Sequence, residues 1–310
     1  SKRDEYVELE DSINNSILDS LGYIMKISSG SITNKPYQQY YMTEVLPFMF
    51  GLLQIKSADP KLLLLPINNI IDAIQYMDFM RDDCIRKLYS ILLQDFENSD
   101  LIQPCVYSLG ICCMNDYGNA ISADQLSSSI VILLRVLGID QGSPLLQLDL
   151  NDEEISRLQD NALSALFRLS VSKQHILGPE VSEQMMRIAL EQFPLKVDLQ
   201  EAKDVHKIFL ELFQAQDMRL LLSEYRLFTE AFSVAAKLKL IVCTEKKKHG
   251  IIEDENEFWG KQIVTKDVAI RIDELIIALL NGAKIDPNLA IKIKIESFTP
   301  RQAARLRESL

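Results

Sequence analysis

The sequence contains few glycines and prolines and no long apolar run. Eleven Gly and ten Pro among 310 residues argue against a β-sheet protein with many turns. Apolar stretches stay below the roughly 18 residues of a membrane-spanning helix, because Pro66 ends the run 62–65. The first residues, SKRDEYVELE, lack the apolar core of a secretion signal. We therefore expect no membrane insertion.

Basic residues are outnumbered by acidic ones. The chain carries 33 Lys and Arg against 44 Asp and Glu, which gives a formal net charge of −11. Proteins that bind nucleic acid generally present a basic surface, so this balance argues against nucleic acid as a partner. An acidic chain instead favours a partner that is itself basic.

Residues typical of catalytic and metal sites are scarce. The five cysteines are odd in number and form no C-x-x-C pair, and there are only three histidines. The sequence also lacks the G-x-x-x-x-G-K-[ST], G-x-G-x-x-G, H-E-x-x-H and G-x-S-x-G motifs. We therefore expect no enzyme activity, no cofactor and no metal, with reduced intracellular thiols that fill the core.

Apolar residues recur at helical spacing along most of the chain. Between 65 and 80, for example, Ile67, Ile70, Ile74 and Met77 follow one another at three- and four-residue steps. Similar stripes predict successive pairs of helices over 45–53 and 65–80, 82–96 and 101–114, 122–137 and 152–171, 181–193 and 198–215, and 224–242 and 267–281, with a short helix at 300–309. The run 290–295 is the one strand-like segment, and it is too isolated to build a sheet.

The helix pairs are spaced like structural repeats. Ala162 and Ala202, at equivalent places in successive second helices, are 40 residues apart, within the period of about 40–47 residues of HEAT repeats. Cys105 and Ala162 are 57 apart, and the excess falls in a predicted inter-helix loop insertion over 138–151. A charged loop is predicted over 244–266. The fold predicted for 1–310 is an all-α HEAT-repeat solenoid, a right-handed superhelix of antiparallel helix pairs; a compact helical bundle is the alternative.

Several of these segments, in order, resemble the importin-beta (karyopherin-beta) family. Residues 44–47 (EVLP) open a helix, and 103–110 (QPCVYSLG) are similar to the family's inner-helix pattern A-x-Y-x-L-G. Residues 193–202 (FPLKVDLQEA) resemble the link L-P-L-x-x-D-x-x-E-A of the importin-beta-three, or Ran-binding-protein-five, subfamily. Residues 298–302 are similar to its final helix. The resemblance covers roughly 40–215 and the tail, and implies a C-terminal fragment of a longer karyopherin.

The resemblance implies a nuclear transport receptor that moves between cytoplasm and nucleus through the nuclear pore. Its partners would be basic protein cargo with nuclear localisation signals, the GTPase Ran and FG-repeat nucleoporins. Cargo would bind a concave, acidic helical surface, and Ran-GTP would regulate the full-length protein. The alternative is a HEAT-repeat scaffold or adaptor that assembles a protein complex without binding Ran or nucleoporins.

Polar residues of the second helices are the candidates for the partner-binding surface, although any one of them is more simply explained as part of a solvated helix face. Acids after the loop insertion are either a binding loop or helix N-terminal residues that complement the helix dipole. The single tryptophan is either a partner anchor or a cap over the last helix pair. The predicted residues are Asn69, Asp72, Gln75, Gln103, Arg157, Asp160, Glu201 and Asp204, with Asp152, Glu153, Glu154 and Trp259.

Overall fold

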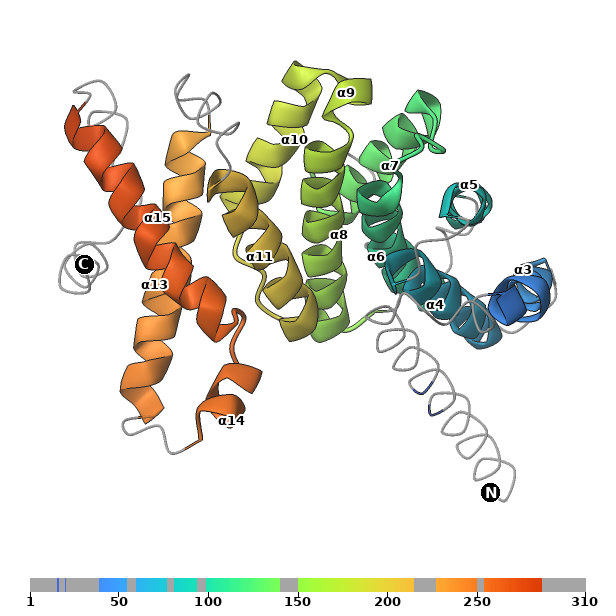
Figure 1. The fold of residues 1–310 in the computed structure, drawn as a ribbon, viewed down its shortest axis with the longest axis horizontal. Coiled ribbons are helices and arrows are strands. Elements are labelled where there is room, and N and C mark those ends of the chain that lie inside the picture. Colours follow the sequence, from blue (N-terminus) through green and yellow to red (C-terminus); the bar gives the residue numbers. More distant parts are fainter. Residues whose placement is uncertain are drawn as a thin grey trace. The chain divides into compact units, whose positions relative to one another are not determined.

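The computed structural model describes residues 16, 20, 39–54, 60–76, 81–93, 99–139, 150–214, 227–249 and 254–285. Within these ranges the protein is all-α, with twelve α-helices, one short π-helix and no strand (Figure 1). The all-α prediction is therefore confirmed for this part of the chain. The segments 290–295 and 300–309 lie outside the described residues.

The chain divides into two compact units, Ser1–Gly178 and Pro179–Leu310. In the first unit, α3 packs on α4, α5 on α6 and α7 on α8, so consecutive helices form the predicted pairs. The second helices also pack on one another, α4 on α6 and α6 on α8 (Figure 1). The elements of this unit are η1 (Tyr41–Val45), α3 (Leu46–Leu53), α4 (Pro60–Tyr76), α5 (Arg81–Leu92), α6 (Ser99–Asn115), α7 (Ala123–Val136), α8 (Asp152–Ser172) and α9 (Gln174–Leu177).

Local chemistry explains where several of these helices begin. Pro47 lies in the first turn of α3, where its lack of an N–H costs no intrahelical bond. Just before it the chain forms a π-turn, in which the Leu46 N–H donates to the carbonyl of Tyr41, five residues back. Helix α7 begins after Ser122, whose hydroxyl accepts from the Gln125 N–H while the Gln125 side chain accepts from the Ser122 N–H. These two reciprocal bonds satisfy N–H groups that a helix start otherwise leaves unpaired.

A small residue lets α6 and α8 approach closely. Gly110 is buried on α6, and a Cβ added there would lie 2.8 Å from the Cα of Ala165 on α8. Real Cβ atoms are not found that close to another backbone atom. The close approach gives a packing reason for the glycine of the 103–110 segment.

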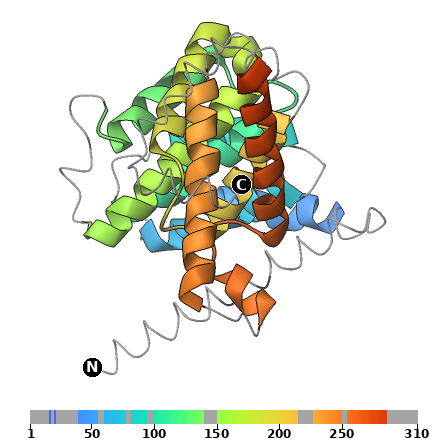
Figure 2. The same ribbon diagram turned by 90° about the vertical axis from the view of Figure 1, so that its left-hand side faces the viewer.

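In the second unit, matching helices of successive pairs run parallel. Helix α10 packs on α13, α11 on α15 and α13 on α15, and Figure 2 shows α13 and α15 side by side. Contacts join Lys203 to Gly260, His206 to Ile263 and Gln214 to Arg271, all 57 residues apart. A constant offset means that α11 and the segment leading into α15 keep the same direction and register. The helices are α10 (Pro179–Gln192), α11 (Leu199–Gln214), α13 (Phe228–His249), α14 (Glu255–Gly260) and α15 (Lys266–Ile285).

The charged segment 244–266 is not one loop, so that prediction was wrong. Helix α13 continues to His249, and α14 forms a further turn over Glu255–Gly260. Glu and Lys are good helix formers, and Lys248 pairs with Glu245 at 2.5 Å on the same helix. The Asp254 carboxylate then accepts from two N–H groups and starts α14. Between α7 and α8, residues 140–149 lie outside the described residues.

Candidate functional site

The predicted polar residues of α4 and α6 are only partly available to a partner. Asp72 and Gln75 on α4 and Gln103 on α6 are partly exposed. Asn69, in contrast, is 1% exposed, and its side-chain oxygen accepts a hydrogen bond of 2.7 Å from the Tyr41 hydroxyl. Asn69 therefore holds the π-turn segment against α4 and is not a surface residue.

Two acids of the predicted inner surface are also buried. Asp160 on α8 is 6% exposed, and Glu201 on α11 is 3% exposed. The prediction of an open acidic wall is wrong for these residues and for Asn69. On α8, every residue from Asp160 to Ser170 is buried, so this stretch has no solvent-facing side. A polar residue in a helical pattern was assumed to mark an exposed face, and that assumption fails for a helix enclosed all round.

The acids that begin α8 build its N-terminus. The Asn151 side-chain oxygen accepts from the N–H groups of Glu153 and Glu154, and the Glu154 carboxylate accepts from the Asn151 N–H at 2.8 Å. Arg157 pairs with Glu153 at 3.1 Å, one turn along the helix. Asp152 lies in the same first turn, where a negative charge complements the helix dipole. These contacts support the helix-start explanation over an acidic binding loop.

Asp204 and Trp259 occupy different settings in the second unit. Asp204 is partly exposed on α11 and accepts a long hydrogen bond of 3.4 Å from Gln200. Trp259 is partly buried on α14, with its ring edge-on to the buried Phe258 and the Lys246 ammonium 5.3 Å from its centroid. The tryptophan thus attaches α14 to the end of α13, which supports the cap explanation.

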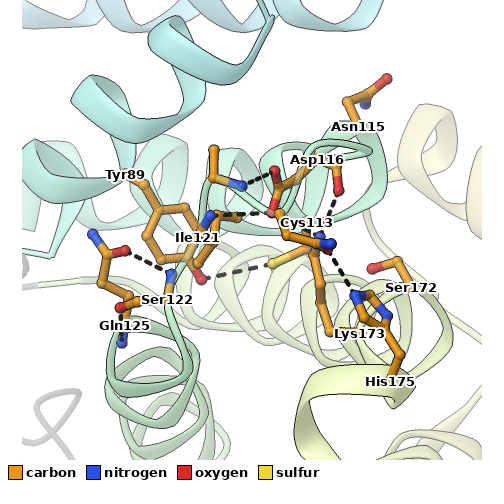
Figure 3. A network of polar contacts seen from close by, with 12 residues as sticks. Tyr89, Cys113, Asn115, Asp116, Ile121, Ser122, Gln125, Ser172, Lys173 and His175 are labelled. Carbon is orange, nitrogen blue, oxygen red and sulfur yellow. Dashed lines mark hydrogen bonds and ion pairs between the residues drawn. The ribbon is translucent and has the colours of Figure 1, made fainter.

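A buried ion pair that the sequence did not predict fixes the loop between α6 and α7 (Figure 3). The Lys173 ammonium donates to both the backbone oxygen and the carboxylate of Asp116, each at 2.7 Å. The two side chains are 1% and 0% exposed. The carboxylate also accepts from the N–H groups of Ala120 at 2.6 Å and Ile121 at 3.2 Å. The charge is therefore paired and hydrogen-bonded, as burial of a charge requires.

The outer part of this loop is held from both sides. Asn119 adopts a positive φ of 55°, and its side-chain oxygen lies 2.7 Å from His175 Nε2 on α9. On the other side, a Cβ added to Gly118 would meet the Asp82 carboxylate of α5 at 1.9 Å. Between these contacts Tyr117 is 74% exposed. Asn, Asp and Gly in the run 115–119 are a sequence signal for a tight turn. The contact with the distant Lys173 has no such signal in the sequence.

The thiols near this loop are poor nucleophiles. Burial raises the pKa of Cys113 to about 12 and that of Cys84 to about 11, and it raises the pKa of Cys112 well above its usual value. Cys113 also contacts the Tyr89 hydroxyl at 3.6 Å, and Tyr89 in turn contacts the Ser129 hydroxyl at 2.6 Å. Because the thiolate is the reactive form, these cysteines stay protonated at neutral pH. The core-filling role predicted for them agrees with this environment.

A buried histidine organises the second unit. His206 Nε2 accepts a hydrogen bond of 3.2 Å from the Leu195 N–H, and Nδ1 donates to the carbonyl of Ile263 at 3.0 Å. Burial lowers the pKa of His206 to about 4, so the ring is neutral at physiological pH. Nearby, the Asp198 carboxylate accepts from the Glu201 N–H at 3.1 Å and starts α11. The distinctive segment 193–202 thus has a structural role.

No protein-family model matches this chain, and no curated protein matches its sequence. Among the residues that the structure describes, no group of three or more His, Cys, Asp or Glu is placed to hold a metal ion. Within the same residues, no helix is both long and apolar enough to cross a bilayer.

Proposed function

We propose that this chain is a HEAT-repeat array of the importin-beta type that binds a basic protein partner. The observation that carries the proposal is the order of packing in the first unit, where α4, α6 and α8 stack while each packs on its own first helix. Stacked pairs bury an apolar seam that one pair alone cannot cover. Parallel register in the second unit supports the same architecture, in which successive pairs build a right-handed superhelix.

Charge supports a basic partner. The net charge of −11 would speed the arrival of a Lys- or Arg-rich segment, and Asp72 and Asp204 stay partly exposed on second helices. In this proposal the cargo is a protein with a nuclear localisation signal, and Ran-GTP controls its release in the longer receptor. The receptor passes between cytoplasm and nucleus by binding the FG-repeat nucleoporins of the nuclear pore. These partners rest on the resemblance of 103–110 and 193–202 to the karyopherin family.

A HEAT-repeat scaffold is the second candidate, and the burial of Asn69, Asp160 and Glu201 favours it. Three of the eight predicted inner-surface residues are buried and so cannot contact a partner directly. In the second unit, ion pairs between helices also neutralise acids, as Arg187 does for Glu230 and Lys239 for Asp273. A scaffold would bind its partners by shape and local contacts, without Ran or nucleoporins.

Pull-downs with Ran and with FG repeats separate the two candidates. Ran loaded with GTP or GDP is presented to this chain and to the longer receptor that we propose contains it, at two salt concentrations. The receptor proposal predicts that the longer protein captures Ran-GTP selectively and that an FG-repeat peptide is retained. Absence of both interactions would favour the scaffold function, and only the HEAT-repeat architecture of the receptor proposal would remain.

A further inference from the structure

Helix α3 is apolar on its exposed side as well as on its buried side. Its eight residues, LPFMFGLL, include no charged or hydrogen-bonding side chain. One side of the helix is buried, and α3 packs on α4 (Figure 1). On the other side Pro47, Phe48 and Gly51 are exposed, Phe48 to 60%. We call this side the outer face of α3. A helix that is apolar all round is normally enclosed on every side.

The first helices of the next two pairs have polar exposed sides. Every exposed residue within 82–92 on α5 is charged. On α7 the exposed residues include Asp124, Ser128 and Arg135, and Val131 is the one large apolar side chain among them. Those two helices therefore face water, as the first helices of a repeat array do at its surface. The outer face of α3 does not fit that role, and it requires a cover.

The sequence ahead of η1 contains an apolar stripe that suits this cover. Its members follow one another at steps of four, four and three residues, and they are Ile13, Ile17, Leu21 and Ile24. Apart from Ser16 and Ser20, this segment lies outside the described residues. Both serines are helical, and the Ser20 hydroxyl donates to the Ser16 carbonyl, one turn back, at 2.7 Å. The spacing predicts an amphipathic helix over 13–24.

We propose that residues 13–24 pack as a helix on the outer face of α3. The connection over 25–39 contains the run SSGS at 28–31 and a proline at 36, which are typical of a loop. Fully extended, it spans at most about 50 Å, whereas a helix over 13–24 is about 18 Å long, so the segment can fold back along α3. Helical spacing places Asn15 and Asp19 opposite the stripe, where they supply the polar outer face that the end of an array needs.

The tether favours this segment over a second copy of the chain. A segment joined by a short linker is present at its target at an effective concentration in the millimolar range. A separate molecule reaches the same face only at its own, much lower, concentration. The inference concerns the end of the helix array, so it does not depend on the basic partner of the proposed function.

Thermal unfolding of the full chain, followed by circular dichroism at two protein concentrations, tests the contact. The variants are Phe48→Ser, Ile17→Ser and the two combined. Val131→Ser is the matched control, because Val131 is an apolar residue of a first helix that is 41% exposed and faces water. Light scattering gives the number of chains in each sample.

We expect a monomer in which Phe48→Ser and Ile17→Ser each lower the unfolding midpoint by about 4–8 °C, while Val131→Ser changes it by less than about 2 °C. The combined variant should fall little below the lower of the two single variants, because both remove the same contact. A Phe48→Ser midpoint equal to that of the control would overturn the proposal, as would additive effects of the two substitutions. A dimer that Phe48→Ser dissociates would show instead that a second copy covers α3.

Discussion

His206 and Ile263 are joined across 57 residues by a hydrogen bond of 3.0 Å from the imidazole Nδ1 to the carbonyl oxygen. The other ring nitrogen accepts from the N–H of Leu195. One uncharged, fully buried side chain therefore ties two connecting segments of the second unit to α11. A protonated imidazole has two donors and no acceptor, so protonation would leave the Leu195 N–H without its partner.

The pKa of His206 predicts that stability falls in mild acid. It is about 4 in the folded protein and near 6.5 in an unfolded chain, so the unfolded state binds more protons between these values. The stabilisation is complete above about pH 6.5 and is lost as the pH falls to about 4, by roughly 3 kcal/mol. Urea unfolding of the second unit at a series of pH values measures this slope.

A His206→Gln variant isolates that contribution. Glutamine does not titrate, so the difference in unfolding free energy between the two proteins should shrink as the pH falls from about 6.5 to 4. His175→Gln is the matched control, because His175 is exposed and its ring contacts the Asn119 side chain in the first unit. A pH-independent difference between His206→Gln and the unmodified chain would show that His206 does not titrate as described.

Breaking the buried ion pair should be costly. Lys173→Met leaves the Asp116 carboxylate buried without its cation, and we expect a loss of about 3–5 kcal/mol in the first unit. Asp116→Asn combined with Lys173→Met removes both charges while keeping an oxygen for the Ala120 N–H. The double variant should therefore be more stable than Lys173→Met alone. Equal stability of the two variants would argue that the pair is not desolvated.

Two glycine substitutions should have opposite effects. Gly110→Ala forces a methyl group to within 2.8 Å of the Ala165 Cα, so we expect a loss of about 1–3 kcal/mol as α6 and α8 separate. Gly51→Ala places a methyl group where no atom lies within 4 Å, and it should stabilise α3 by up to about 1 kcal/mol. Thermal unfolding of both variants gives the comparison, and a neutral Gly110→Ala would rule out the close packing.

The start of α8 separates helix capping from partner binding. Asn151→Ala removes the acceptor for two N–H groups and should cost about 1 kcal/mol in unfolding free energy. Asp152 is an exposed acid whose side chain accepts no such bond, so Asp152→Asn should change the unfolding free energy by a few tenths of a kcal/mol at most. If Asp152→Asn instead weakens capture of a basic peptide several-fold without altering stability, the acids of this turn belong to a binding surface after all.

Sequence periodicity predicted the helices well where apolar stripes were regular. Helices α7 and α8 begin and end within about one residue of the predicted bounds, because capping boxes mark their starts. Prediction was poorer for α4, expected at 65–80 but found at Pro60–Tyr76, so the helix begins five residues earlier and contains Pro66 in its interior. A proline inside a helix costs stability, but apolar packing of the helix against its neighbours can outweigh that cost.

Site residues were harder to predict than helices. Periodicity identifies the apolar side of a helix, but it does not reveal how many neighbours cover the remaining sides. Asp160 and Glu201 were therefore placed at a surface although they are buried. Lys173 and Asp116 are 57 residues apart, and nothing in the local sequence of either one signals the other. Contacts of this kind depend on the packing of α6 against α8.

Binding of a labelled basic nuclear-localisation peptide is the most direct test of the account. Asp72→Lys with Asp204→Lys reverses two partly exposed acids of second helices, while Glu44→Lys in η1 with Glu191→Lys on α10 makes the same change in net charge at exposed positions outside the second helices. Fluorescence anisotropy at moderate salt should show about tenfold weaker binding for the first pair and less than about threefold for the second. Equal affinities for both pairs and the unmodified chain would contradict a partner-binding surface on the second helices.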